Sequence, residues 1–596
     1  MKKLIQPALF FLFPLLTILI VEYPIRLSVM EVVDWGLEKP LYIVVTYLII
    51  FLVQSLLLAL INNFYLSVII NQILFGLVTV TNYYKMIFLN DPILPWDLVF
   101  VKQIFDLLPN LKGMVPINLI LITGVIVLLI TAAVIKYTKF NVLSIRRRVA
   151  VFVISFGMLL TIASYPSNFF NKLMAELELS SVAWDYKVSL DHNGLVLNFV
   201  SKINEMSIPT PDNYSKKEVN KIVESIEATE TTVSDIQPNI VVIMSEAFWE
   251  FEKILPNYEG ESYYPTVNEY KVGSIVSPSY GGGTSNVEFE VLTGYSNSLL
   301  PEGSVPYQQF MSPYVPALPN LLKEYGYETS AFHTYHKYFW NRVVAYPALG
   351  FDRFVGLEDL ESPDYHGAFV DDREVNELVL NQLKDSSQPQ FIYAVTMQNH
   401  GMYVDGRYGS DTMPIATEYS EKTNNMINTY ATGVVHSDNV LKELLEEIEA
   451  LDEPTLVVFF GDHLPYLENA YNEAGFVDPQ GNLTLEDQLK LKETPLAVWN
   501  NYGKQIDDVG SVSTSFLAPY IVEWAELKMP TYYRFLSNFS ENMPGYTSIV
   551  KLDADGGLHA ETPDYMVELE RQYRMLQYDL LHGNRYLEKL EAEIKK

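Results

Sequence analysis

Five uncharged apolar stretches occupy most of the first 165 residues of this 596-residue chain. Each has about the 17–25 residues that an α-helix needs to cross the hydrocarbon core of a bilayer. We therefore predict an α-helical membrane bundle of five transmembrane helices in residues 1–165. The stretches are Leu4–Val21, Leu41–Ile61, Phe64–Tyr84, Leu119–Ile135 and Val149–Tyr165.

The cationic residues beside these stretches predict an orientation. Lys2 and Lys3 precede the first stretch, and no small-residue cleavage site follows it, so we interpret it as an anchor and not a cleaved signal. A second cationic cluster, within residues 136–148, separates the fourth stretch from the fifth. Cationic loops stay in the cytoplasm. The N-terminus is therefore predicted to be cytoplasmic in a multi-pass cell-membrane protein, with everything after about Tyr165 extracellular.

Composition excludes several classes of function. The net charge of −31 argues against nucleic acid as a partner, because phosphate backbones need a basic surface. A phosphorylated substrate stays possible, since a metal ion can supply local positive charge. The chain has no cysteine, which excludes thiol catalysis, disulfides and thiolate metal sites. Any metal must be held by histidine, carboxylate, hydroxyl or carbonyl groups.

The pattern of the chain changes after a predicted helical connector, residues 166–237. In residues 238–596, short apolar runs alternate with helical segments, which indicates an α/β domain with a mainly parallel sheet. The runs are Ile240–Met244, Thr329–Phe332, Phe391–Met397, Leu456–Phe460 and Leu496–Trp499, and the helical segments include Ala317–Tyr325, Asp372–Lys384 and Tyr419–Leu451.

Residues that can bind metal follow four of these five runs. Glu246 follows the first run, His333 the second and His400 the third, and Asp462 and His463 follow the fourth. Ligands of parallel sheets bind beyond the carboxyl ends of the strands. We therefore expect these side chains to meet at one edge of the sheet.

Glu246, Asp462 and His463 supply oxygen and imidazole donors suited to Mn²⁺, Zn²⁺ or Mg²⁺. The alternative for Asp462-His463 is a strand-end turn in which the aspartate caps a helix. The convergence of the strand ends favours the metal site over that alternative.

A glycine-rich segment supplies a candidate nucleophile. Gly281–Gly283 let the backbone turn tightly, and Thr284 and Ser285 follow where a helix beginning near Asn286 would start. A hydroxyl there can face an anion held by free backbone N–H groups. A nearby metal would stabilise the Thr284 alkoxide for attack on phosphorus. The alternative is a glycine turn with a Ser or Thr N-cap.

Four further residues could form the substrate side of this site: His333, Trp340, Arg342 and His400. An arginine binds phosphate oxygens bidentately, and a histidine can hydrogen-bond the phosphate or protonate a leaving alkoxide. Trp340 could form a wall against a small polyol. The alternatives are that Trp340 belongs to the core and that Arg342 pairs with a carboxylate.

With these residues in place, the chain resembles the lipoteichoic acid synthase family of phosphoglycerol transferases, within the alkaline phosphatase and sulfatase superfamily. The Gly282–Gly294 segment (GGTSNVEFEVLTG) and Phe339–Arg342 (FWNR) distinguish this family from ordinary sulfatases, which have Cys or Ser as the nucleophile. The other matching segments are Asn239–Glu246, Asn399–Gly401, Gly461–His463 and Thr494–Asn501.

The resemblance implies an extracellular sulfatase-like domain and a transferase that takes glycerol phosphate from phosphatidylglycerol in the bilayer and passes it to a glycolipid or a growing polymer. Thr284 would carry the glycerol phosphate covalently, with His400 assisting the leaving group. One divalent ion, Mn²⁺ before Mg²⁺ or Zn²⁺, would be bound by Glu246, Thr284, Asp462 and His463, and the phosphoglycerol would be contacted by His333, Trp340, Arg342 and His400.

The segment between His333 and Trp340 departs from the family pattern, because it contains the bulky Tyr335, His336 and Tyr338. The acceptor is therefore left open. A phosphodiester hydrolase and a phosphoethanolamine-type transferase on the same site are the alternative enzymes, and an inactive membrane scaffold is a third. The intact metal and nucleophile set argues against the scaffold.

Overall fold

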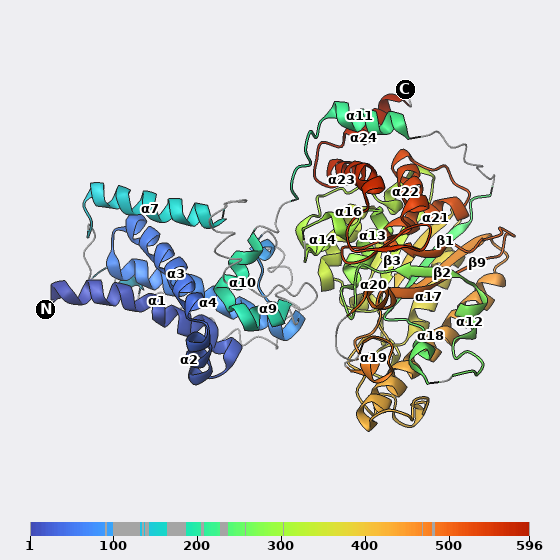
Figure 1. Cartoon of the computed structure of the whole chain (residues 1–596), viewed down its shortest axis with the longest axis horizontal. Coiled ribbons are helices and arrows are strands. Elements are labelled where there is room, and N and C mark those ends of the chain that lie inside the picture. The colour runs from blue at the N-terminus through green and yellow to red at the C-terminus, as the bar shows by residue number, and fades with distance from the viewer. Residues whose placement is uncertain are drawn as a thin grey trace. The chain divides into compact units, whose positions relative to one another are not determined.

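The computed structural model describes two compact units, Met1–Ser207 and Ile208–Lys596 (Figure 1). Their boundary lies within the range predicted for the connector. The described residues are 2–89, 92–98, 131–133, 136, 142–163, 186–203, 208–226, 236–256, 258–301, 303–467, 469–478 and 483–594.

The first unit is helical. Three of its helices, α1 (Lys2–Arg26), α3 (Pro40–Ile61) and α4 (Phe64–Leu89), are long and apolar enough to span a membrane. They coincide with the first three predicted spans and are candidates for them by length and composition. The fourth predicted span lies almost wholly outside the described residues. The fifth predicted span coincides with helix α7 (Ile145–Ala163), which has three arginines in its first turn. This helix is not one of the three that are long and apolar enough to span a membrane.

Polar side chains connect the helices of this unit. Gln54 of α3 donates a hydrogen bond to the Phe10 carbonyl of α1 at 2.8 Å, and Gln72 of α4 donates to the Thr17 hydroxyl at 2.7 Å. Such bonds between membrane helices contribute about 0.6 kcal/mol each. The remaining described helices of the unit are α2 (Val29–Glu38), α9 (Tyr186–Asn193) and α10 (Leu195–Ser201).

An eight-stranded sheet forms the centre of the second unit, in the order β10-β2-β9-β8-β1-β7-β3-β4. Strands β8, β1, β7, β3 and β4 are parallel to one another, and β10 is parallel to β2, whereas β9 is antiparallel to both of its neighbours. The predicted mainly parallel sheet is thus confirmed. The bounds are β1 Asn239–Ser245, β2 Lys271–Val276, β3 Glu328–His333, β4 Arg353–Val355, β7 Gln390–Val395, β8 Thr455–Gly461, β9 Glu493–Asn500 and β10 Gly510–Ser513.

Helices cover both faces of this sheet (Figure 1), which explains why its central strands are continuous apolar runs. Val242 of β1 packs in a core with α13, α21, α22 and α23, whereas its neighbour Val241 packs in a second core with α17 and α18. The helices are α13 Thr284–Thr293, α15 Leu318–Glu324, α16 Arg342–Leu349, α17 Asp372–Asp385, α18 Glu421–Glu449, α21 Leu517–Trp524, α22 Thr531–Asn542 and α23 Val567–Leu581.

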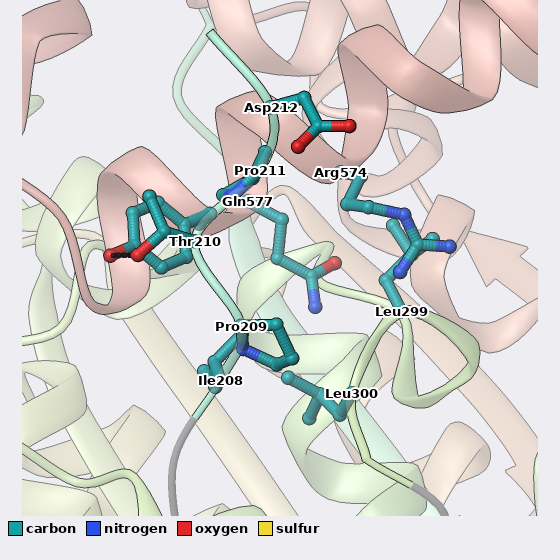
Figure 2. A pocket seen from close by; sticks show the side chains of 10 residues that line it. Ile208, Pro209, Thr210, Pro211, Asp212, Leu299, Leu300, Arg574 and Gln577 are labelled. Carbon is teal, nitrogen blue, oxygen red and sulfur yellow. Dashed lines mark hydrogen bonds between the residues drawn. The ribbon is translucent and has the colours of Figure 1, made fainter. Parts of the chain in front are cut away.

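The start of the second unit is attached to its C-terminal helices. The Tyr214 hydroxyl donates to Asp579 Oδ1 at 2.5 Å, and the Thr210 and Tyr578 hydroxyls are 2.9 Å apart. Residues 208–212 line a cavity of about 230 Å³ together with residues of α23 that include Arg574 (Figure 2). The chain therefore enters this unit in a defined position.

Smaller elements complete the second unit. The strands are the hairpin β5 (Tyr365–His366) and β6 (Phe369–Val370) and the small sheet β11 (Gly545–Tyr546), β12 (Lys551–Leu552) and β13 (Leu558–His559), and the helices are α11 Lys216–Ser225, α12 Pro265–Glu269, α14 Pro306–Gln309, α19 Ala470–Glu473, α20 Leu485–Lys490 and α24 Tyr586–Ile594.

The last residue of β8 tests how tightly the sheet packs at its carboxyl edge. A Cβ added to Gly461 would lie 1.9 Å from the Phe248 carbonyl oxygen, which is backbone and cannot swing aside. We expect Gly461→Ala to lower the free energy of unfolding by about 3 kcal/mol. Denaturant unfolding of the detergent-solubilised chain measures this change. Asn439→Ala, at an exposed position of α18, is the control, and equal stability of the two variants would contradict the packing.

Candidate active site

The parallel strands bring the predicted ligands to one edge of the sheet. Glu246 directly follows β1, and Asp462 and His463 directly follow the neighbouring β8. Ser245 pairs with Gly461 in register, so the two strands end at the same level. The Glu246 backbone N–H is held by the Thr396 hydroxyl, which lies just after β7, at 3.1 Å. Three neighbouring strands thus build the site.

Glu246, Asp462 and His463 form a buried cluster whose candidate ligand atoms all lie within 4.8 Å of one another. His463 Nε2 is 3.2 Å from Asp462 Oδ2 and 4.0 Å from Glu246 Oε1. Two ligand atoms that bind one ion, each through a bond of about 2.0–2.2 Å, are separated from each other by distances like the two given above. The spacing therefore suits a single divalent cation.

Hydrogen bonds orient the ligands and leave one atom of each available. Asp462 Oδ1 accepts from the backbone N–H groups of Ala247 at 2.7 Å and His463 at 2.9 Å, while Oδ2 has no hydrogen-bond partner among the described residues. His463 Nδ1 donates to the Leu464 carbonyl at 3.0 Å, so Nε2 presents a lone pair, for which the described part of the chain offers no hydrogen-bond partner either. Unpaired buried polar atoms cost about 1–3 kcal/mol each. A bound cation would satisfy both atoms at once.

The electrostatics of the cluster also favour a cation. Burial, and after it the negative charge of Asp462, raise the pKa of the Glu246 carboxyl to about 8, while His463, Arg342 and Thr284 act in the opposite direction. Two carboxylates in a water-poor site repel each other. A divalent ion removes that repulsion.

Thr284 lies beside this cluster, because its side chain is close enough to the Glu246 carboxylate to lower the pKa of that group, against the larger effect of burial. Helix α13 begins at Thr284 itself, two residues earlier than predicted, after Gly283 at φ 86°. The Gly281 N–H donates to the Leu464 carbonyl at 3.0 Å, which holds the glycine segment beside the strand-end ligands. The nucleophile predicted from the glycine pattern therefore lies against a predicted metal ligand.

Arg342 is fully buried and pairs with Glu288 of α13. Its Nε lies 3.0 Å from Glu288 Oε1, its Nη2 contacts the same oxygen, and the Tyr346 hydroxyl donates to Oε2 at 2.8 Å. The alternative prediction for Arg342, that it pairs with a carboxylate, is therefore confirmed. Arg342 still acts on the site, because its charge lowers the pKa of both Glu246 and His333. Sequence reasoning missed Glu288, although it follows Thr284 by four residues and therefore shares its helix face.

The Phe339–Arg342 segment places Trp340 in an unusual backbone conformation. Trp340 (φ 56°) and Asn341 (φ 60°) are both left-handed, which costs about 1–2 kcal/mol per residue. The Asn341 side chain donates to the Tyr307 carbonyl at 2.7 Å and stabilises this turn. Trp340 is half-buried and belongs to neither hydrophobic core. Such strain is concentrated at functional sites.

His333 and His400 have the same ring nitrogen, Nε2, left as an acceptor. His333 Nδ1 donates to the Val395 carbonyl at 3.1 Å and His400 Nδ1 to the Gly401 carbonyl at 2.8 Å, so in both neutral rings Nε2 is the acceptor. Burial lowers the pKa of both histidines, and the charge of Arg342 lowers that of His333 further. Both side chains are therefore suited to accept a proton or a hydrogen bond.

Comparison with known proteins identifies the family. The Sulfatase family profile matches residues 238–527. A Rhizobium meliloti (strain 1021) protein named for cyclic β-1,2-glucan modification is 32% identical over 517 residues, covering 84% of this chain and 80% of the relative. A lipoteichoic acid synthase-like protein of Bacillus subtilis (strain 168) is 28% identical over 280 residues. The chain belongs to the lipoteichoic acid synthase-like group of the alkaline phosphatase and sulfatase superfamily.

The predicted resemblance and the prediction of an enzyme are confirmed by this membership. The match to the Bacillus relative covers 44% of this chain and 42% of the relative. A phosphoglycerol transferase of Streptococcus pyogenes, solved in complex with sn-glycerol-1-phosphate, superimposes with a TM-score of 0.53 at 22% identity, covering 65% of this chain and 98% of that chain. That likeness supports the sulfatase-like fold described above.

Removal of a strand-end ligand tests the metal site. We expect the wild-type chain in detergent to retain a divalent ion after desalting and Asp462→Asn to retain one equivalent fewer, because the variant lacks the carboxylate charge. Elemental mass spectrometry counts the ions. His559→Ala is the control, since it removes a different His–Asp pair, with Asp553 at 2.7 Å. Equal metal content in wild type and Asp462→Asn would argue against the site.

The Arg342–Glu288 pair generates a stability prediction. Glu288→Ala leaves the buried guanidinium without its partner and should lower the free energy of unfolding by about 3–5 kcal/mol. The double variant Glu288→Ala/Arg342→Met removes both charges and should recover most of this loss. Denaturant unfolding of the three chains checks the coupling. Additive losses in the double variant would show that the two side chains do not depend on each other.

Proposed function

We propose that this chain is a metal-dependent transferase that moves glycerol phosphate from phosphatidylglycerol to a hydroxyl group of a cell-envelope glycolipid or polymer. The position of Thr284 carries the proposal: its side chain lies beside Glu246, in a cluster where Asp462 Oδ2 and His463 Nε2 have no hydrogen-bond partner among the described residues. Membership of the lipoteichoic acid synthase-like group supports the same chemistry.

In the first step, the Thr284 hydroxyl gives its proton to Nε2 of the neutral His400 ring and its Oγ forms a bond to phosphorus, while the bond from phosphorus to the diacylglycerol oxygen breaks. His400 then passes this proton to the leaving alkoxide, and Thr284 carries the glycerol phosphate. Glu246, Thr284, Asp462 and His463 would hold the ion, for which we propose Mn²⁺ because the donors are carboxylate, hydroxyl and imidazole. When bound, it would lower the energy of the alkoxide and neutralise phosphate charge.

In the second step, the acceptor hydroxyl forms a bond to phosphorus and the bond to Thr284 breaks. His400 is suited to take the acceptor's proton, because its Nδ1 is already a donor to the Gly401 carbonyl and its Nε2 has the lone pair. His400 then passes this proton to the departing Thr284 oxygen, which restores the hydroxyl and the neutral ring. The residue would therefore be acid and base in turn.

We assign each residue on the substrate side of the site to the part of the substrate that its chemistry suits. The neutral His333 offers only an acceptor at Nε2, so we assign it to a glycerol hydroxyl and not to a phosphate oxygen. Arg342 supplies positive charge, although Glu288 occupies its Nε and Nη2 atoms. Trp340, half-buried in a strained turn, is assigned as a wall of the glycerol pocket.

The acceptor is proposed from the relative that covers most of the chain. That Rhizobium meliloti protein is named for modification of a cyclic β-1,2-glucan, and its similarity covers 84% of the present chain. A sugar hydroxyl of an envelope glucan or related polymer is therefore our first choice of acceptor. A glycolipid is the second.

We also propose the membrane topology on which this reaction depends. Three described helices are suited to span the bilayer, and two further apolar stretches, Leu119–Ile135 and Val149–Tyr165, would make five. The cationic clusters put the N-terminus in the cytoplasm and the catalytic unit outside. The donor lipid would then be taken from the outer leaflet.

A covalent intermediate on Thr284 is the critical test. We expect mass spectrometry to find a glycerol-phosphate adduct on Thr284 when the detergent-solubilised chain is incubated with Mn²⁺ and phosphatidylglycerol. Thr284→Ala should lose the adduct and at least about 10³-fold of turnover, because the nucleophile is gone.

Ser285→Ala is the matched control, since Ser285 is the adjacent buried hydroxyl. It should keep both adduct and turnover. An adduct on Ser285, or normal turnover by Thr284→Ala, would refute the assignment. Release of free glycerol phosphate at the same rate with and without a glucan acceptor would identify a hydrolase instead.

A further inference from the structure

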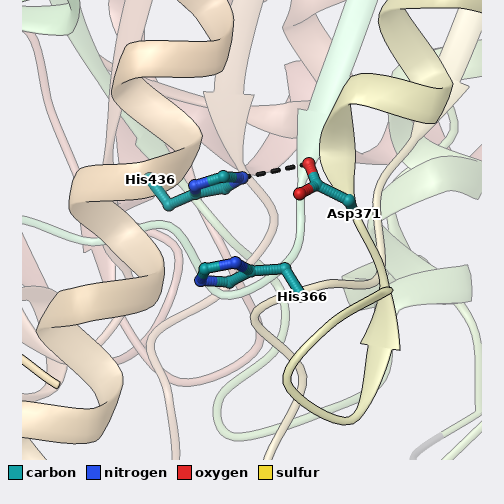
Figure 3. A group of neighbouring side chains, drawn as sticks. All are labelled: His366, Asp371 and His436. Atoms are coloured by element: carbon teal, nitrogen blue, oxygen red, sulfur yellow. Dashed lines mark hydrogen bonds and ion pairs between the residues drawn. The ribbon is translucent and has the colours of Figure 1, made fainter. Parts of the chain in front are cut away.

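A second group of metal-type side chains lies outside the active-site cluster. His366 is on β5 of the small hairpin, Asp371 is the N-cap residue of α17, and His436 is on α18. Their candidate ligand atoms all lie within 4.8 Å of one another, and Figure 3 shows the rings of His366 and His436 stacked, with Asp371 beside His436. Three separate elements thus contribute one nitrogen or oxygen each.

The contacts within this group show that its nitrogen atoms are not all occupied. His436 Nε2 lies 3.0 Å from Asp371 Oδ1, and the rings of His366 and His436 are stacked at 4.1 Å with an interplanar angle of 10° (Figure 3). His366 Nε2 is buried and has no hydrogen-bond partner among the described residues.

The surrounding charges leave room for a cation. Asp371 and the adjacent buried Asp372 supply two carboxylates, and Asp372 Oδ1 has no hydrogen-bond partner either. The facing cation, Arg373, is 3.6 Å from Asp371 Oδ2 but is already held by Glu443 at 2.8 and 2.9 Å. The other nearby guanidinium, Arg407, donates to the His400 carbonyl at 2.7 Å.

We propose that His366, Asp371 and His436 form a second divalent-cation site, distinct from the cluster around Glu246. Two imidazole nitrogens and one carboxylate oxygen are a donor set suited to Zn²⁺. Because a ring nitrogen's lone pair lies in the plane of its ring, binding requires one of the stacked rings to turn toward the ion. His366 is the ring that turns, since it is half-buried on a two-residue strand, whereas His436 is fixed in the long helix α18.

The position of the hairpin gives this cation a role. Phe369 of β6, three residues from His366, packs edge-on against the His400 ring at 5.4 Å and against Tyr335 at 6.2 Å. An ion bound by His366, Asp371 and His436 would join the hairpin to the start of α17 and to α18. It would therefore hold in place a wall of the active site without contacting the substrate.

The test counts ions in the full chain in detergent, stripped with EDTA, loaded with Zn²⁺ and desalted. The double variant Asp462→Asn/His463→Ala removes the cluster at the sheet edge, so any ion that it retains lies elsewhere. We expect it to bind one equivalent and the triple variant with His366→Ala to bind none. Adding His559→Ala instead, which removes the His–Asp pair with Asp553, should leave one equivalent.

Spectra and stability separate ligation from misfolding. Co²⁺ in the double variant should give d–d absorption that His366→Ala abolishes, and Zn²⁺ should raise the melting temperature of the double variant but not that of the triple variant. Asp371→Asn, which keeps the helix N-cap, should weaken Zn²⁺ binding with the fold intact. No ion in the double variant, or one equivalent still bound in the triple variant, would overturn the proposal. Neither result bears on the Thr284 adduct, so the two proposals fail separately.

Discussion

The parallel pairing of β1 with β8 determines where the chemistry of this protein lies. Ser245 is in register with Gly461, so the next residue of each strand, Glu246 and Asp462, leaves the sheet at the same level. This arrangement requires the backbone at Gly461 to approach the Phe248 carbonyl more closely than any side chain permits. A shift of one residue in this register would turn the strand faces over and separate the two carboxylates.

The site concentrates charges that the fold alone does not neutralise. Glu246 and Asp462 are buried side by side, and within the described ranges Asp462 Oδ2 and His463 Nε2 have no hydrogen-bond partner. By contrast, the nearby charge of Arg342 is compensated within the protein by Glu288. The difference separates a buried charge that the protein itself compensates from buried groups that a bound cation would satisfy.

The proposed second cation would stabilise a part of the site that the sheet does not hold. The residues that we propose as catalytic lie after strand ends and at a helix start, which are rigid, but the Phe369 side chain beside His400 is carried by a hairpin of two-residue strands. Short hairpins are only marginally stable in isolation. A metal that links His366 to α17 and α18 would give this wall the rigidity that the sheet gives to the ligands.

Much of this architecture follows from local sequence pattern, because apolar runs and glycine turns are short-range signals. The strands around Glu246, His400 and Asp462, the helix at Thr284 and the ligand positions at strand ends were predictable on that basis. The antiparallel direction of β9 and the short strand β2, whose register with β9 shifts between Lys271 and Gly273, were not predictable, since a strand's direction depends on its partners. Of the five predicted spans, three coincide with described helices that are long and apolar enough to cross a membrane.

The sequence by itself therefore determined the kind of fold, the family and the set of candidate ligands. Only the tertiary structure decided which of those side chains meet. It paired Arg342 with Glu288, placed Thr284 against Glu246, and brought together His366, Asp371 and His436, which are up to 70 positions apart along the chain. The reason is physical: such contacts arise from strand register and helix packing across the whole domain, and no local pattern encodes them.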